Sequence, residues 1–231
     1  MSYVPEYSHL NPDRISPMET AINEFDGPIK LLEIGTWTAD GSTQLWFKHL
    51  KPGSSIMLID VWHPYCHNDY NGNNGGVYKA VDDLAHKSFV RTFDNVVKFQ
   101  ETNKEVDVTI VRADSNKFLQ CLADKTFDFI YIDGCHYYSK VNADIIEAKR
   151  LIKDTGVICG DDLEQPAKGV YVDAARNFPE NDYISVDGTG HMIHPGVTLA
   201  VYENFNGDVN LVNGFWWLYH NNGTFSKERT F

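Results

Sequence analysis

The chain has 231 residues, of which 42% are hydrophobic and 23% charged, a composition typical of one globular domain with a complete core. Its formal net charge of −12 disfavours a nucleic-acid partner, because non-specific affinity for a phosphate backbone comes from lysine and arginine. No apolar run reaches the roughly 18 residues that a membrane helix needs, and the first residues lack the pattern of an export signal. We therefore predict a cytoplasmic protein with no membrane or nucleic-acid partner.

Short apolar runs alternate with helical patterns along most of the chain. Residues 1–29 are polar and contain three prolines, and we predict an N-terminal arm with one short helix around Met18–Phe25. The predicted strands are Lys30–Gly35, Ser55–Trp62, Val108–Ala113, Phe127–Ile132, Gly156–Gly160, Tyr183–Val186 and Val197–Tyr202. Further helices are predicted at Gly41–Leu50, Val141–Ile152 and Val170–Phe178. This alternation predicts a Rossmann-like α/β domain over residues 30–203, with a seven-stranded, mostly parallel sheet and helices on both faces.

A β-hairpin is predicted at the end of the chain, in a C-terminal extension over residues 204–231. Phe215–His220 and Thr224–Lys227 flank an Asn-Asn-Gly turn, and an Asn-Gly pair between extended runs is a strong hairpin signal. The aromatic run Phe215–Trp217 offers a surface for a homo-oligomer, and its alternative is burial on an edge strand.

One insertion interrupts the regular spacing, from residue 62 to about residue 100. Long loops in compact domains are usually lids or binding loops, and we predict a lid with a mobile tip. Its first half contains polar and aromatic residues that suit contact with a ligand: His63, Tyr65, His67, Asp69 and Tyr70. The alternative is a solvated loop, rich in Asn and Gly, without a role.

Carboxylates follow most of the predicted strands. In an open parallel sheet, ligands bind at the carboxyl ends of the strands. The acidic residues at these ends are Glu33, Asp60, Asp114, Asp133, Asp161 and Asp162. Stability alone does not explain them, because like charges at close range raise each other's pKa and cost free energy. We therefore expect a binding site along this edge of the sheet.

The turn after the first strand argues against a dinucleotide ligand. A dinucleotide-binding fold has a glycine two residues after Gly35, where a pyrophosphate approaches the backbone, but Trp37 stands there. The looser pattern of Glu33, Gly35 and Gly41 suits a ligand without a phosphate. Two alternatives stay open on this fold: an NAD(P)-dependent oxidoreductase and a non-catalytic interaction domain.

The first turn, the acidic residue that ends the second strand and the Asp-Ser pair after the third resemble class I S-adenosylmethionine-dependent methyltransferases. The resemblance implies that Asp60 holds the ribose hydroxyls and that Gly35 lets the backbone approach the methionine part. It places Asp114 and Ser115 beside the adenine. The cofactor-binding residues that it implies are Glu33, Gly35, Thr36, Gly41, Ser42, Thr43, Asp60, Asp114, Ser115 and Asp133.

The pattern I-D-G-x-H-x-Y at Ile132–Tyr138 and the pattern G-D-D at Gly160–Asp162 resemble the macrocin O-methyltransferase-like family, over roughly residues 30–203. This resemblance implies a Mg²⁺ ion held by three carboxylates: Asp133, Asp161 and Asp162. Carboxylates are ligands that Mg²⁺ prefers, and the ion would neutralise their cluster. In the alternative, Asp161 caps the following turn and only Asp162 faces the site.

The catalytic base is also suggested by this resemblance. Family members have either an Asp two residues after the metal-binding Asp or a His three residues after it, and this chain has Cys135 and His136 there. His136 is thus implied as the base, and its alternative role is to orient a ligand or the backbone. Together these expectations describe Mg²⁺-dependent O-methylation of a small-molecule hydroxyl on a sugar, phenol or natural product.

Overall fold

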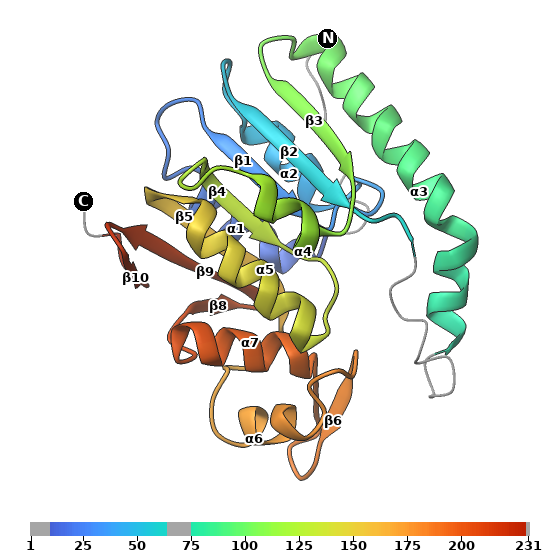
Figure 1. The fold of residues 1–231 in the computed structure, drawn as a ribbon, viewed down its shortest axis with the longest axis vertical. Coiled ribbons are helices and arrows are strands. Elements are labelled where there is room, and N and C mark those ends of the chain that lie inside the picture. The colour runs from blue at the N-terminus through green and yellow to red at the C-terminus, as the bar shows by residue number, and fades with distance from the viewer. Residues whose placement is uncertain (1–9, 64–74, 230–231) are drawn as a thin grey trace.

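A mostly parallel sheet forms the centre of the protein, with helices on both faces (Figure 1). The structure is a computed structural model, and it describes residues 10–63 and 75–229. In spatial order the strands are β10 (Thr224–Ser226), β9 (Gly214–Asn221), β5 (Ile152–Leu163), β4 (Phe127–Ile132), β1 (Lys30–Ile34), β2 (Ser55–Asp60) and β3 (Asp107–Arg112). An eighth strand, β8 (Asn210–Val212), pairs with β9. The predicted α/β class is confirmed, with eight strands in this sheet where seven were expected.

Neighbouring residues of each central strand point to opposite faces, so the sheet separates two apolar cores. Leu32 and Ile130 face a core that contains α5 (Tyr138–Leu151) and α7 (Pro195–Phe205). Leu31 and Phe129 face the other core, with side chains from three helices. These helices are α1 (Pro12–Ile22), α2 (Ser42–His49) and α3 (Gly75–Thr102). The strands are thus apolar on both faces, as a sheet covered by two helical layers requires.

The predicted strand Val197–Tyr202 is wrong, because these residues lie in α7. Every residue from Pro195 to Val201 is buried, so the segment has no polar face to show a helical period, and a short apolar run looks alike in a strand and in a buried helix. Pro195, at the start of the helix, is the residue that marks it as helical.

The predicted strand Tyr183–Val186 corresponds to β6 (Ile184–Val186), which lies outside the central sheet. Within the described part of the chain it pairs with β7 (His191–Ile193) alone, in a two-stranded sheet. The remaining short elements are α4 (Ser115–Phe118), the 3₁₀ helix η2 (Leu119–Cys121) and α6 (Val170–Asn177), which packs against α7.

The N-terminal helix begins earlier than the sequence suggested, at Pro12 instead of Met18. Asn11 caps it by accepting a hydrogen bond from the backbone N–H of Asp13 (3.0 Å). Met18, Ala21 and Ile22 are buried against the sheet. This part of the predicted arm therefore belongs to the core, and it brings α1 close to the ends of β5 and β9.

Most of the described part of the predicted insertion is helix α3. Its tip, with Tyr65, His67, Asp69 and Tyr70, lies outside the described residues. The buried stripe of α3 is Ala85, Ser88, Thr92, Asn95, Val96 and Phe99, at the spacing of one helix face. Half of that stripe is polar, which hides the helical pattern in the sequence. Among the described residues, no helix combines the length and the apolar character that crossing a membrane requires.

The predicted hairpin is confirmed as β9 and β10, joined by Asn222 and Gly223 with positive φ angles of 46° and 92°. β9 also pairs antiparallel with β5, so the hairpin extends the central sheet. Phe215 and Trp216 are buried, each in one of the two cores. A role of the hairpin in self-association stays a prediction, as do the boundaries at residues 29 and 203.

Candidate functional site

A cavity of about 420 Å³ opens at the carboxyl ends of β1, β2 and β4. β1 lies between β2 and β4 in the sheet, so the chain winds away from this point in two directions, and ligands of open α/β sheets bind at such a switch point. Most of the sequence-predicted site residues line it: Gly35, Thr36, Gly41, Ser42, Asp60, Asp114, Ser115, Asp133 and Asp161. Four others do not line it: Glu33, Thr43, His136 and Asp162.

Gly35 lies where the ends of β1 and β4 come closest. Its N–H donates to the carbonyl oxygen of Ile59 (2.8 Å), and its φ angle is +85°. A Cβ atom added there would lie 1.8 Å from the carbonyl oxygen of Asp133. Only glycine therefore fits, for both its backbone conformation and the space that it leaves.

Asp60 organises the loop that follows β1. Its Oδ2 accepts hydrogen bonds from the backbone N–H groups of Thr36 (3.0 Å) and Trp37 (2.8 Å), and its Oδ1 accepts one from Trp62 (2.8 Å). The buried Oγ1 of Thr36 has no hydrogen-bond partner among the described residues. Because Thr36 lines the cavity, a ligand there can supply that partner.

Helix α3 braces the same loop from outside. The carbonyl oxygen of Trp37 accepts hydrogen bonds from Trp62 Nε1 and Thr92 Oγ1, both at 2.7 Å. Arg91 pairs with Asp40 (2.9 Å). Trp37 and Trp62 have positive φ angles of 51° and 41°, which non-glycine residues keep only when their surroundings hold them there. The described part of the predicted lid thus supports the cavity wall.

Asp114 and Ser115 lie at the third strand end, as predicted. Asp114 caps α4 by accepting from the backbone N–H of Asn116 (3.1 Å), and it pairs with Lys140 (3.2 Å). Asn116 in turn donates to Asp144 on α5 (2.7 Å). Asp114 therefore both caps α4 and lines the cavity.

Glu33 is fully buried beneath the cavity and holds the start of α2. It accepts hydrogen bonds from Ser42 Oγ (2.5 Å) and Thr43 Oγ1 (2.8 Å). Burial raises the pKa of Glu33 to about 7, against the hydrogen bonds, which lower it. Glu33 and Thr43 thus act on a ligand only through the position of α2.

Replacing Glu33 with glutamine tests this placement. In the folded state the carboxyl keeps its proton up to about pH 7, whereas in the unfolded state it releases it near its ordinary value of 4.5. Stability therefore falls as pH rises through this window. We expect Glu33→Gln to remove that fall, so that its free energy of unfolding exceeds that of the wild type by about 3 kcal/mol at pH 8. Urea unfolding between pH 5 and pH 8 measures it, and parallel curves for the two proteins would contradict a buried, titrating Glu33.

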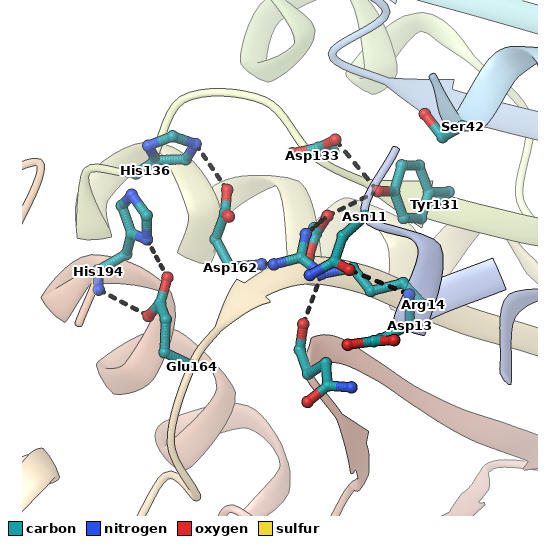
Figure 2. Close-up of polar contacts among 12 residues, drawn as sticks. Asn11, Asp13, Arg14, Ser42, Tyr131, Asp133, His136, Asp162, Glu164 and His194 are labelled. Carbon is teal, nitrogen blue, oxygen red and sulfur yellow. Dashed lines mark hydrogen bonds and ion pairs between the residues drawn. The ribbon is translucent and has the colours of Figure 1, made fainter. Parts of the chain in front are cut away.

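The hydroxyl group of Tyr131 lies between the carboxylates of Asp133 and Asp161 at the ends of β4 and β5 (Figure 2). Tyr131 Oη donates towards Asp133 Oδ2 (3.1 Å) and Asp161 Oδ2 (3.3 Å). The Arg14 guanidinium, from α1, pairs with the same oxygen of Asp161 and donates to the carbonyl oxygen of Asn213. Removal from water and the charges of Asp161 and Asp162 raise the pKa of Asp133 well above its ordinary value.

A β-bulge in β5 contains Asp161 and Asp162, and it directs their side chains to different places. Gly160 and Leu163 of β5 pair with Trp216 and Gly214 of β9, so β5 has one extra residue there. Asp162 has a φ angle of +62°, and its N–H donates to Asp161 Oδ1 (2.8 Å). The bulge turns Asp161 towards the cavity and Asp162 towards His136.

His136 lies between two carboxylates beside the cavity. Its Nε2 contacts Asp162 Oδ2 (2.9 Å), and its Nδ1 contacts Asp182 Oδ1 (2.8 Å). Burial opposes the charged form, but these two contacts raise the pKa of His136 well above its ordinary value. The two carboxylates thus favour the protonated form of the imidazole, which pairs with both of them.

Several residues of the site escaped the sequence reasoning. Arg14 lies in a polar segment with no motif, and Tyr131 looks like an ordinary strand residue. Asp182 and His194 come from a region of short elements after β5. Lys140 alone carried a signal, since it follows the I-D-G-x-H-x-Y pattern by two residues.

The fold and the site together define an α/β protein with a cavity at its switch point, where proteins of this architecture bind small ligands. A family model described as a methyltransferase domain matches residues 32–163, more than half of the chain. The chain belongs to this family. The narrower resemblance to macrocin O-methyltransferases stays a prediction, and no curated protein sequence matches the chain.

Solved methyltransferase structures share the fold. An O-methyltransferase from Bacillus cereus, described as a complex with SAH, is 18% identical, with 91% of this chain and 82% of that chain covered and a TM-score of 0.56. A putative caffeoyl-CoA O-methyltransferase from Staphylococcus aureus is 13% identical, with coverage of 91% and 84% and a TM-score of 0.55. A putative O-methyltransferase from Klebsiella pneumoniae is 15% identical, with coverage of 93% and 83% and a TM-score of 0.54. At these identities the likeness concerns the fold.

Proposed function

We propose that this chain is an S-adenosylmethionine-dependent O-methyltransferase that acts on a hydroxyl group of a small molecule. The observation that carries the proposal is the cavity at the switch point, with Gly35 and Asp60 at the ends of β1 and β2. Family membership supports methyl transfer. The net charge of −12 disfavours a nucleic acid as the acceptor.

The residues present fit S-adenosylmethionine. The cavity of about 420 Å³ lies in the range of small-molecule sites, and its lining combines apolar side chains such as Ile34 and Ile59 with polar and charged ones. Thr36 Oγ1 is a buried polar atom that lacks a partner among the described residues, and both Thr36 and Gly35 line the cavity. Asp60, Asp114 and Ser115 would hold the nucleoside part. When bound, the cofactor supplies an electrophilic methyl group.

Asp133 is the base that the geometry favours. It lines the cavity, whereas His136 does not, and burial together with the charges of Asp161 and Asp162 raises its pKa, which makes it a stronger base than a solvated carboxylate. The acceptor hydroxyl would give its proton to Asp133 as its oxygen gains the methyl group. Burial opposes the charged form of Asp162, but its contact with His136 lowers the pKa of Asp162, so this carboxylate would stay ionised. This assignment replaces His136, the base that the sequence implied, with a neighbouring residue.

The described carboxylates do not fit the Mg²⁺ ion that the sequence implied. Mg²⁺ needs oxygen ligands in an octahedral arrangement. Both oxygens of Asp161 already accept hydrogen bonds, one of them from the Arg14 guanidinium, whose positive charge stands beside these acids. The bulge points Asp162 at His136. The reaction as proposed therefore has no Mg²⁺ step, and adding Mg²⁺ should leave its rate unchanged.

Calorimetric titration of S-adenosylmethionine tests the proposal. We expect wild-type protein to bind it, and Asp60→Ala to lose more than about tenfold in affinity, because three backbone N–H groups lose their acceptor. Asp128→Ala is the matched control, since Asp128 lies on β4 outside the cavity lining and contacts Lys153. Absence of wild-type binding, or binding of NAD instead, would overturn the proposal.

Turnover separates the base from the binding residues. With a panel of phenols and sugars as acceptors and mass spectrometry as the readout, Asp133→Asn should lower the rate by about 100-fold or more while it still binds the cofactor. If His136→Asn lowers the rate more than Asp133→Asn does, then His136 is the base.

A further inference from the structure

Two histidines and an aspartate converge beside the cavity, outside its lining. The ligand atoms of His136, Asp162 and His194 all lie within 4.8 Å of one another. Figure 2 shows the two imidazole rings next to each other with Asp162 beside them, and the ring centroids are 4.3 Å apart. Two imidazole nitrogens and one carboxylate oxygen are a ligand set that divalent transition metals prefer.

Each histidine is held by a second carboxylate on its other ring nitrogen. His136 Nδ1 contacts Asp182 Oδ1 at 2.8 Å, and His194 Nδ1 contacts Glu164 Oε1 at 2.5 Å. Glu164 also accepts from the backbone N–H of His194 (3.0 Å). Histidines that bind metals almost always donate their other N–H to such a group, which fixes the ring and leaves Nε2 for the ion. Both rings of this cluster have such a carboxylate on Nδ1, and Nε2 of His136 faces Asp162, the third proposed ligand.

The fold brings these residues together from separate elements. His136 lies in the loop before α5, His194 precedes Pro195 at the start of α7, and Asp162 is placed by the bulge of β5. Their side chains are 18%, 13% and 21% exposed, so the cluster is shielded but open to an ion from solvent. The positions of the three side chains are thus fixed by three separate elements and by two further carboxylates, Asp182 and Glu164.

We propose that His136, Asp162 and His194 form a binding site for one divalent transition metal ion of the Zn²⁺ class. The ion takes the place of the proton between His136 and Asp162. Three protein ligands leave one tetrahedral position for water or an oxygen of another molecule. The proposal does not depend on methyl transfer, and it differs from the carboxylate trio of the sequence analysis in its ligands and in its metal.

Titration with Co²⁺, followed by its visible absorption, and with Zn²⁺, followed by calorimetry, tests this site in the full chain. We expect one ion per chain, with the intense absorption of tetrahedral Co²⁺. His194→Ala should abolish this signal. Asp182→Asn and Glu164→Gln should each weaken Zn²⁺ binding by about 10-fold to 100-fold. The matched control is His191→Ala, which removes a histidine three positions away whose Nδ1 contacts Tyr171.

The outcomes distinguish this site from metal binding elsewhere on the chain. Zn²⁺ binding that His194→Ala and His191→Ala leave equally intact would overturn the proposal. Loss of binding in Asp133→Asn with retention in His194→Ala would also overturn it, in favour of the carboxylate trio. A circular dichroism spectrum and a urea unfolding curve of His194→Ala that match those of His191→Ala show that the variant is folded, whether or not the chain binds S-adenosylmethionine.

Discussion

Replacing Gly35 with alanine is expected to lower the free energy of unfolding by about 3–5 kcal/mol and to abolish cofactor binding. The added Cβ would lie 1.8 Å from the carbonyl oxygen of Asp133. That oxygen cannot easily move away, because the N–H of Asp133 donates to Ile34 (2.8 Å) and Ile34 pairs with Ile132 in the sheet. The strands must therefore separate where the cavity begins.

Gly35→Ala combines two costs, the positive φ angle and the close contact with Asp133, and Gly188→Ala measures the first of them alone. Gly188 has a similar positive φ angle of +73°, but nothing lies within 4 Å of its added Cβ. It should lose only about 1 kcal/mol, for the backbone conformation alone. Urea unfolding of both variants gives the difference that belongs to the contact with Asp133. Equal losses would show that the ends of β1 and β4 are not held together as described.

Much of the fold could be predicted because local patterns carry it. The strands around the cavity are short apolar runs, and the strand ends are marked by Gly35, Asp60, Asp114 and Asp133. In a parallel sheet these ends meet at one edge whatever the details of packing, so a sequence alone places them together. The same reasoning failed at α7, where burial on all sides removes the period that distinguishes a helix.

The finer arrangement of the site depends on contacts between distant segments. Asp161 and Asp162 are adjacent in sequence, and nothing there shows that a one-residue bulge turns them apart. Arg14 reaches Asp161 across 147 positions of sequence, and His194 reaches His136 from the residue that precedes α7. Such pairs are set by how α1 and α7 pack, which no local pattern encodes. The sequence therefore predicted acidic residues at this edge correctly but not their partners.

Replacing Arg14 with methionine should lower the free energy of unfolding by about 3 kcal/mol at pH 8, because it leaves Asp161 charged and unpaired in a site that is only 8% exposed. Burial and the charge of Asp162 already raise the pKa of Asp161 to about 6 against the effect of Arg14. Without Arg14 this pKa rises further, so the folded state holds its proton over a wider range. The loss should thus be small at pH 5 and grow as pH rises.

A double-mutant cycle isolates the ion pair from the rest of the Arg14 side chain. Arg14→Met combined with Asp161→Asn has no buried charge left at position 161, and it should recover most of the stability at pH 8. The contact of Arg14 with Asn213 is lost in both variants and accounts for the remainder. Lys48→Met is the control, since its pair with Glu19 is 46% and 28% exposed and should contribute less than about 1 kcal/mol. If Arg14→Met behaves like Lys48→Met at every pH, then Arg14 does not supply the positive charge of this acidic cluster, and the case against a Mg²⁺ ion there loses its basis.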